Sequence, residues 1–288
     1  MSGAALISVI VTTYNREAAL DAALRALARQ SDLNFEIVVA DDGSGSDTAR
    51  LVESWRSRLP VPLKHVRHEH AGFRGGEIRN RGIAASAGEL CIFLDGDCLA
   101  PRHFVAAHRR LSEPGWFVFG NRILLSRALT EAALAKGLAV ESWTFAALLR
   151  QRLAGGINRL LPTVHLPLGP LRKYGSRRWE GAKTCNLAVA RRDLERVDGF
   201  DCFYTGWGLE DSDLVVRLLH AGVRRKDGRF ATGVLHLWHP DNDRSRLPAN
   251  QARLDALLGS SRVRALRGLS VLADDGRQAA GSAAMAQR

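Results

Sequence analysis

The first 120 residues alternate short β-branched hydrophobic runs with segments whose apolar residues recur at helical spacing. Residues 6–11 (LISVIV) and 35–40 (FEIVVA) have the length and composition of buried strands. Residues 17–30 lie between them and carry leucines at helical spacing. A helical segment over 47–58, a strand-like run over 63–66 and a helical segment over 77–86 then precede a fourth run at 90–94. This order of strands and helices predicts an α/β fold with a mostly parallel sheet.

Polar clusters follow three of these hydrophobic runs. They comprise residues 12–16 (TTYNR), 41–44 (DDGS) and 95–97 (DGD). A single aspartate after a strand often serves only to make a turn. Parallel sheets, however, bind ligands at the carboxyl ends of their strands. Three clusters at one sheet edge therefore predict the rim of an acidic, hydroxyl-rich pocket.

The pattern changes in the middle of the chain. Residues 128–153 are alanine-rich with helical spacing, whereas glycine and proline interrupt residues 155–175. Residues 142–179 contain seven Lys and Arg, no Asp or Glu, and interleaved leucines. Two interpretations stay open: a core helix with a solvated basic face, or a helix lying on an anionic bilayer surface.

Regular patterns return after residue 183. We predict a strand over 184–190, a helix over 209–220 and a last strand within 230–238. The chain therefore divides into segments 1–122, 123–182, 183–260 and a tail over 261–288. The tail is predicted to be disordered beyond about Asp275, because it consists mainly of small and polar residues there.

Composition limits the function classes. The 288 residues, 46% of them hydrophobic, are enough to bury a core, and a net charge of +11 favours anionic partners: nucleic acid, phosphorylated substrates or an acidic membrane surface. The four cysteines form no CxxC pair, which favours a reducing, cytoplasmic compartment. No signal-peptide pattern is present and no apolar run approaches the length of a membrane span, so neither export nor membrane spanning is expected.

Two motifs carry candidate metal ligands. Asp95 and Asp97 flank a glycine after a buried strand, so both carboxylates project to one side and suit a divalent cation, Mg²⁺ or Mn²⁺, held against a phosphate. His236 and His239 lie in the run HLWHP. Each is either a packing residue or an imidazole ligand, and an imidazole ligand would favour Mn²⁺ over Mg²⁺.

Two further motifs lead into predicted helices. Residues 206–213 (GWGLEDSD) place acids in a first helical turn, where they either start the helix or supply an ionised proton acceptor beside the aromatic face of Trp207. Residues 72–82 are rich in glycine and arginine and suit phosphate binding. No GK[ST] or GxGxxG follows, which disfavours kinases and dehydrogenases.

Taken in order, these motifs resemble the nucleotide-sugar glycosyltransferases of inverting family 2, which have the GT-A fold. The resemblance rests on SVIVTTYNR, IVVADDGSGSDT, IRNRGIAASAGELCIFLDGDCLAP and GFDCFYTGWGLEDSDLVVRLLHAG. The last block is also similar to the C-terminal motif of galactosyltransferases and chondroitin-type polymerases, and HLWHP to their metal-binding histidine segment. The resemblance covers about residues 6–122 and 183–240, and implies a Rossmann-like nucleotide-binding sheet joined to an acceptor-binding half.

The resemblance implies roles for nucleotide-binding residues. Uridine would be held by Thr12, Tyr14 and one of Asp41 and Asp42, and the diphosphate would meet Arg79. Two departures from the family pattern occur in these motifs: the first lacks a frequent proline, and the second continues with Gly45 in place of threonine.

The resemblance also implies the metal and catalytic residues. Asp95 would contact the ribose or the metal, and Asp97 would bind the metal with His239, His236 or both. Asp211 would be the general base. Glu210 and Trp207 would position the acceptor. On this basis segment 1–122 binds the nucleotide sugar and segment 183–260 carries the acceptor site and base. The basic segment 123–182 matches no motif of the family, and its composition leaves contact with a membrane surface or with the acceptor as its possible role.

The expected function is that of a metal-dependent inverting glycosyltransferase. It would move a hexose or N-acetylhexosamine from a UDP-sugar to a hydroxyl of a glycan or lipid-linked acceptor, in bacterial surface polysaccharide or lipopolysaccharide synthesis. Mn²⁺ or Mg²⁺ is the expected cofactor, with contact to the inner face of the cell membrane and no nucleic-acid partner. The alternatives are a nucleotidyltransferase acting on sugar phosphates, a basic nucleic-acid-binding protein and an inactive glycan-binding relative.

Overall fold

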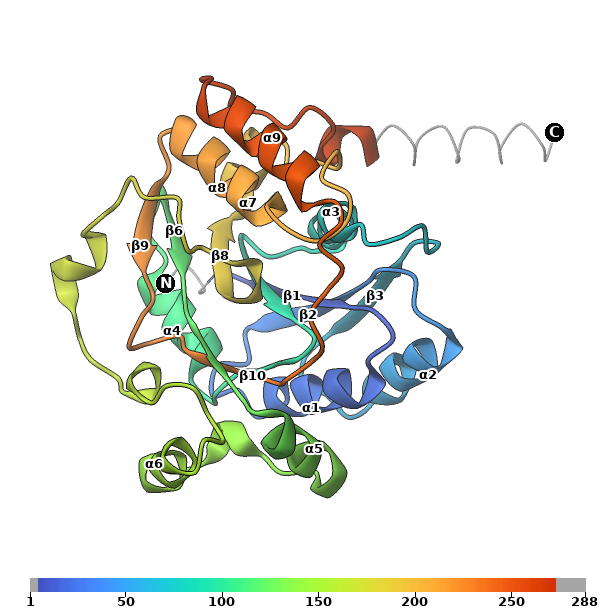
Figure 1. Ribbon diagram of the computed structural model, residues 1–288, viewed down its shortest axis with the longest axis vertical. Helices are drawn as coiled ribbons and strands as arrows, with labels where there is room; N and C mark the ends of the chain where they lie inside the picture. The colour runs from blue at the N-terminus through green and yellow to red at the C-terminus, as the bar shows by residue number, and fades with distance from the viewer. Residues whose placement is uncertain (1–4, 273–288) are drawn as a thin grey trace.

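The computed structural model describes residues 5–272 and contains a large, mostly parallel sheet (Figure 1). From edge to edge its strands are β3 (Leu63–Arg67), β2 (Phe35–Asp41), β1 (Ile7–Thr13), β4 (Leu90–Asp95), β8 (Leu187–Ala190), β6 (Trp116–Phe119) and β9 (Arg224–Asp227). Strands β3, β2, β1 and β4 are parallel, β8 is antiparallel to both of its neighbours, and β9 is parallel to β6. The predicted α/β class is confirmed.

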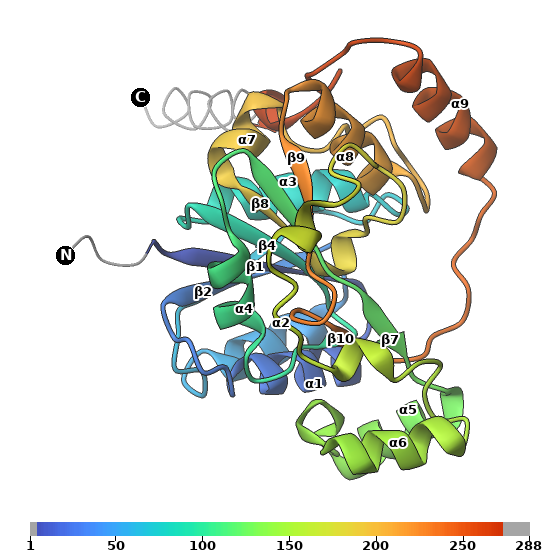
Figure 2. The same cartoon turned by 90° about the vertical axis from the view of Figure 1, so that its left-hand side faces the viewer.

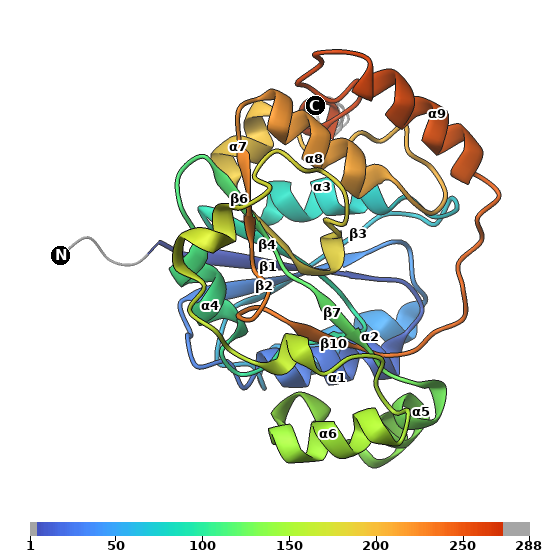
Figure 3. The same cartoon turned by 60° about the vertical axis from the view of Figure 1, so that its left-hand side comes forward.

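Helices cover both faces of this sheet, as the alternation of side chains along each strand requires (Figure 3). Val9 and Val11 belong to the core on one face, whereas Ile10 belongs to the core on the other. The first face is covered by α1 (Glu17–Leu27), α2 (Ser46–Trp55) and α4 (Phe104–Leu111). The second is covered by α3 (Gly75–Ala85), α7 (Arg191–Arg196) and α8 (Glu210–His220).

A three-stranded sheet, in the order β5 (Cys98–Leu99), β10 (Val234–His236) and β7 (Arg122–Leu124), lies beside the large one. Next to it pack α5 (Arg127–Lys136) and α6 (Phe145–Leu153), which project from one end of the molecule (Figure 2). The single helical segment predicted over 128–153 was therefore wrong. Gly137 has a φ of 61° and ends α5 in the left-handed conformation that glycine adopts most readily.

The remaining regular structure is short, apart from α9 (Leu247–Leu258), which packs on α8. Short 3₁₀ helices occupy Val140–Ser142, Leu161–Thr163, Gly169–Lys173 and Thr184–Asn186. Within the described part of the chain, no helix combines the length and the hydrophobicity needed to cross a bilayer.

The segments predicted as 1–122 and 183–260 share one sheet. The strand predicted over 184–190 begins only at Leu187, because the preceding residues form a 3₁₀ turn. The amide of Asn186 in that turn donates to the carbonyl oxygens of Asn121 and Thr232. Strand β8 then enters the sheet between β4 and β6.

The disorder predicted for the tail beyond Asp275 concerns residues outside the described part of the chain.

A buried ion pair holds α8 in place. Arg217 is fully buried, and its Nε donates to Asp213 Oδ1 at 2.5 Å while Nη1 donates to the carbonyl oxygen of Val197 at 2.7 Å. Burial raises the pKa of Asp213, while Arg217 acts in the opposite direction. The guanidinium thus favours the ionised form of this buried carboxylate and connects α8 to the loop after α7.

Replacing Arg217 should destabilise the fold. We expect Arg217→Met to lower the free energy of unfolding by about 3–5 kcal/mol, because Asp213 would lose its main partner while staying buried. Chemical denaturation measures the change. The exposed Arg196→Met variant on α7 should change stability by less than about 0.5 kcal/mol. A loss below about 1 kcal/mol for Arg217→Met would show that Arg262, 3.4 Å from Asp213, suffices.

A buried histidine fixes the loop between β3 and α3. His68 Nε2 lies 2.5 Å from Asp42 Oδ1, and its Nδ1 lies 3.5 Å from Glu77 Oε1. Burial acts to lower the pKa of His68, but the hydrogen bonds with Asp42 and Glu77 outweigh it and raise the pKa above 6.5. The hydrogen bond with His68, the largest cause, and other cationic contacts lower the pKa of Glu77 to about 2.

The interactions of His68 should make stability depend on pH. A raised folded-state pKa gives stability that is fully present below pH 6.5 and is lost as the pH rises through the folded value. We therefore expect His68→Gln to lower the free energy of unfolding more at about pH 6 than at about pH 9. NMR titration of the ring should give a midpoint above 6.5. A midpoint below that value would contradict the prediction.

Candidate active site

A cavity of about 360 Å³ opens at the carboxyl edge of β1, β2 and β4. The first turn of α8 and the chain after β10 form further parts of its wall. The structure brings most of the predicted site residues together here. Those that line the cavity are Thr12, Tyr14, Asp42, Arg79, Asp95, Asp97, Trp207, Glu210, Asp211 and His239. Asp41 and His236 do not line it.

The end of β1 provides an aromatic ring and a free hydroxyl. Tyr14 is 40% exposed and stacks on His70, with ring centroids 4.6 Å apart and an interplanar angle of 12°. Thr12 Oγ1 is buried and has no hydrogen-bond partner among residues 5–272. A flat ligand ring and a polar ligand atom would both find complementary groups at this strand end.

The end of β2 separates the two adjacent aspartates. Asp41 is fully buried, and it accepts from the backbone N–H of Ser44 at 2.8 Å and lies 3.1 Å from His65 Nε2. Asp42 lines the cavity and accepts from the backbone N–H of Arg74. Successive side chains of an extended strand point to opposite sides. Of the two candidates for contact with a base, only Asp42 therefore reaches the cavity.

The DGD segment after β4 supplies a carboxylate beside two imidazoles. Asp97 Oδ1 lies 3.4 Å from His236 Nε2, and Asp97 Oδ2 lies 3.7 Å from His239 Nε2. Burial lowers the pKa of His236, which favours the neutral, metal-binding form of the imidazole. One carboxylate and two imidazoles form a donor set that suits a borderline divalent cation such as Mn²⁺.

Two neighbours complete the surroundings of Asp97. Cys98 Sγ also lies within 4.8 Å of the Asp97 and His236 ligand atoms, but burial raises the pKa of this thiol well above its usual range and so disfavours the thiolate ligand. Arg16, which none of the predicted roles includes, donates from Nη1 to Asp97 Oδ2. Arg16 is the last residue of the polar cluster 12–16 that follows β1. Its place in that cluster is the sequence pattern from which a role at the site could have been predicted.

Arg79 of α3 joins opposite walls of the cavity. Its Nη2 donates to Asp95 Oδ1 at 3.2 Å, and its Nη1 donates to Glu210 Oε1 at 3.1 Å. The side chain is buried, and both amino groups already bind carboxylates. Burial, followed by the charge of Asp211, raises the pKa of Glu210, whose Oε2 has no hydrogen-bond partner within the described chain. Glu210 thus keeps one buried carboxylate oxygen that no described residue hydrogen-bonds.

Asp211 lies in the first turn of α8, where the helix dipole favours a negative charge. Its Oδ1 accepts from the backbone N–H of Ser212 at 2.8 Å, and its Oδ2 lies 3.6 Å from Lys183 Nζ. The side chain of Asp211 is 10% exposed and borders the cavity. A carboxylate in this position can accept a proton from a bound hydroxyl.

A strained turn places Trp207 on the cavity wall. Gly206, Gly208 and Leu209 have φ values of 71°, 106° and 75° immediately before α8. A positive φ is uncommon for leucine, and such strain clusters at ligand sites. Trp207 lines the cavity, and the Arg244 guanidinium lies 5.3 Å from its ring centroid.

Basic side chains outside the predicted motifs also line the cavity. Lys183 follows the basic middle segment, and Arg122 begins β7. The sequence contained no pattern that singled them out, because each reaches the site only through the packing of its segment. Together with Arg16 they place cationic groups next to the acidic ones, an arrangement suited to a diphosphate.

Comparison with protein families gives two matches along the chain. The model for glycosyl transferase family 2 matches residues 8–155, about half of the chain. The model described as the N-terminal domain of galactosyltransferase matches residues 172–240. The first match contains the ends of β1, β2 and β4, and the second contains Lys183, Trp207 and Asp211.

Curated relatives are glycosyltransferases of greater length. The chain is 32% identical over 248 residues to a validoxylamine A glucosyltransferase of Streptomyces hygroscopicus subsp. limoneus, covering 80% of this chain and 51% of that protein. It is 26% identical over 253 residues to a chondroitin synthase of Pasteurella multocida (strain Pm70), covering 78% of this chain and 24% of that protein. The chain thus spans about half or less of the length of these relatives.

Solved structures with a similar fold include TarS 1–349 of S. aureus in complex with UDP-GlcNAc. The TM-score is 0.58 at 16% sequence identity, with 88% of this chain and 66% of that chain covered. This likeness confirms the predicted GT-A fold. Together with the family match over the strand ends that build the cavity, it leads to one conclusion: the chain belongs to glycosyl transferase family 2.

Proposed function

We propose that the protein transfers a hexose or N-acetylhexosamine from a UDP-sugar to a hydroxyl of a glycan or glycolipid acceptor, with inversion at the anomeric carbon. One observation carries the proposal: Asp211 at the start of α8 and the DGD segment after β4 lie on the walls of a single cavity. A bacterial surface polysaccharide or lipopolysaccharide is the proposed product class. The similarly folded TarS, whose structure holds UDP-GlcNAc, supports a UDP-sugar donor.

The donor would bind along the carboxyl edge of the sheet. Tyr14 offers a ring face to uracil, and Asp42 offers an acceptor for its N3–H. Arg79, Asp95 and Arg16 would lie near the ribose and diphosphate. Charges of both signs line this region, so cationic groups can approach phosphate oxygens while carboxylates bind hydroxyls.

A divalent cation, Mn²⁺ or Mg²⁺, would be held by Asp97 with His239 and His236. When bound, such an ion stabilises the negative charge that develops on a departing diphosphate. The nearby guanidinium of Arg16 acts in the same electrostatic sense, because it lies beside Asp97 and lines the cavity.

Asp211 would act as the general base. Its carboxylate takes the proton of the attacking acceptor hydroxyl as the new glycosidic bond forms and the bond to the diphosphate breaks. A single displacement of this kind inverts the anomeric centre. Lys183 Nζ and the Ser212 N–H lie next to this carboxylate, and Trp207 and Glu210 would position the acceptor sugar by stacking and hydrogen bonding.

A cytoplasmic site of action forms part of the proposal. Cys91, Cys98, Cys185 and Cys202 are all free thiols, and the first three are buried. Free thiols suit a reducing compartment. UDP-sugar donors would be met in that compartment. Neither a nucleotidyltransferase activity nor nucleic-acid binding is supported by the family match.

Removing the base should separate transfer from donor binding. We expect Asp211→Asn to lower kcat by about 10²- to 10⁴-fold, because the amide cannot accept the hydroxyl proton. Affinity for the UDP-sugar should stay within about threefold, as measured by calorimetry. Asp47→Asn is a matched control, since Asp47 also lies in the first turn of a helix but outside the cavity. Normal turnover by Asp211→Asn would disprove the assignment.

Replacing Asp97, the carboxylate proposed to bind the metal, should weaken nucleotide binding, in contrast to the replacement of Asp211. We expect Asp97→Asn to weaken Mn²⁺-dependent binding of UDP by about tenfold or more, with little change in the presence of EDTA. Thermal shift and nucleotide release with a panel of UDP-sugars, each with Mn²⁺ or Mg²⁺, provide the measurement. Asp241→Asn, in the exposed chain after β10, is the control. If no UDP-sugar stabilises the wild-type protein with either metal, the proposed function fails.

A further inference from the structure

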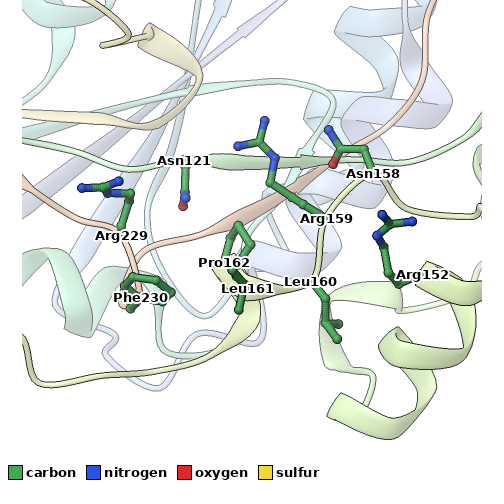
Figure 4. A pocket seen from close by; sticks show the side chains of 9 residues that line it. All are labelled: Asn121, Arg152, Asn158, Arg159, Leu160, Leu161, Pro162, Arg229 and Phe230. Atoms are coloured by element: carbon green, nitrogen blue, oxygen red, sulfur yellow. The ribbon is translucent and has the colours of Figure 1, made fainter.

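A second cavity, of about 470 Å³, lies outside the candidate active site and next to α6 (Figure 4). Leu160, Leu161 and Pro162 form an apolar part of its wall, and Arg152 and Arg159 line it with their basic side chains. No aspartate or glutamate lines this cavity among the residues that the structure describes. Its chemistry is therefore apolar and positively charged.

The positive charge of this cavity is uncompensated at two positions. Arg152 and Arg159 are exposed, and neither forms an ion pair within residues 5–272. In Figure 4 Arg152 and Arg229 lie on opposite sides of the cavity, and Arg159 lies between them. Arg229 Nε lies 2.5 Å from Asp227 Oδ2, so its charge is already balanced. Two free guanidinium groups thus remain at the cavity.

An exposed apolar stripe runs along the neighbouring helix. Phe145, Leu149 and Leu153 of α6 are 53%, 39% and 80% exposed. Their spacing of four residues places them on one side of the helix. Leu148, on another side, is buried in the core beneath the small sheet. Arg152 belongs to α6 itself, so the stripe and the cavity are parts of one surface, at the end of the molecule opposite α7 (Figure 1).

Two other basic residues of the middle segment, Arg172 and Lys173, have internal roles. Arg172 is buried and donates to the carbonyl oxygens of Leu166, Asp227 and Arg229. Lys173 Nζ lies 2.6 Å from Glu113 Oε1. These two side chains are engaged in contacts that stabilise the fold, so we do not assign them to the binding of a partner. Arg150, Arg152, Arg159, Arg177 and Arg178 are exposed and form no ion pair within residues 5–272, and of these Arg152 and Arg159 line the cavity beside α6.

We propose that α6 and the adjacent cavity dock the protein on an anionic bilayer. Phe145, Leu149 and Leu153 enter the boundary between headgroups and acyl chains, and Arg152 and Arg159 bind lipid phosphates. The bilayer satisfies both features of this surface. A free phosphate would leave the apolar stripe in water, and an uncharged apolar partner would leave the guanidinium groups unpaired. The proposal goes beyond sugar transfer and does not depend on it.

Vesicle flotation tests the proposal with the whole 288-residue chain. We expect binding to vesicles that contain phosphatidylglycerol, weak binding to pure phosphatidylcholine and a decrease with added salt. Arg152→Gln combined with Arg159→Gln should weaken binding about 30-fold, since each basic residue near the surface contributes about 1 kcal/mol. Leu153→Ser should weaken it about tenfold by removing buried apolar area.

Matched control variants distinguish docking through α6 from a general effect of charge or hydrophobicity on vesicle binding. Arg192→Gln with Arg196→Gln removes two exposed arginines from α7, and Leu266→Ser replaces another exposed leucine. Both should leave vesicle binding within about threefold of wild type.

The proposal is overturned if these controls lose as much binding as the α6 variants, or if the wild-type protein does not bind anionic vesicles. It is also overturned if inorganic phosphate displaces the protein and Leu153→Ser binds normally, because the cavity would then bind a free anion. None of these results depends on turnover.

Discussion

The buried guanidinium of Arg79 is the interaction on which the arrangement of the site depends. It bonds to Asp95 at the end of β4 and to Glu210 at the start of α8, two segments far apart in the chain. Attraction between opposite charges is strong where water is excluded, and a buried guanidinium without carboxylates would be costly. This double ion pair therefore sets the distance between the carboxyl edge of the sheet and the helix that carries Asp211.

The acids of the cavity follow a common principle, since each has a cationic or hydrogen-bonding partner from another segment. Asp97 pairs with Arg16, Asp211 lies near Lys183, and Asp42 contacts His68. Such pairing offsets part of the repulsion between carboxylates that lie within one small volume. An acidic site can thus exist in a protein whose net charge is +11.

The positive charge itself has at least three uses. Some arginines and lysines balance the cavity acids, and Arg172 satisfies backbone carbonyl groups inside the fold. Arg152 and Arg159 remain free beside the apolar face of α6. The sequence showed a basic segment without acids but could not divide it among these uses, because the partner of each side chain lies elsewhere in the chain.

The sequence by itself determined the α/β class, the alternation of strands and helices over residues 6–94, and most residues of the candidate site, but not strands β5, β6, β7 and β9. Hydrophobic periodicity and polar clusters after strands are local patterns, so they can be recognised in the sequence without knowing how the segments pack together. The choice between Asp41 and Asp42, and the positions of Arg16, Arg122 and Lys183 at the cavity, were decided only by tertiary structure. Each depends on backbone direction or on contacts between distant segments, and no local pattern contains that information.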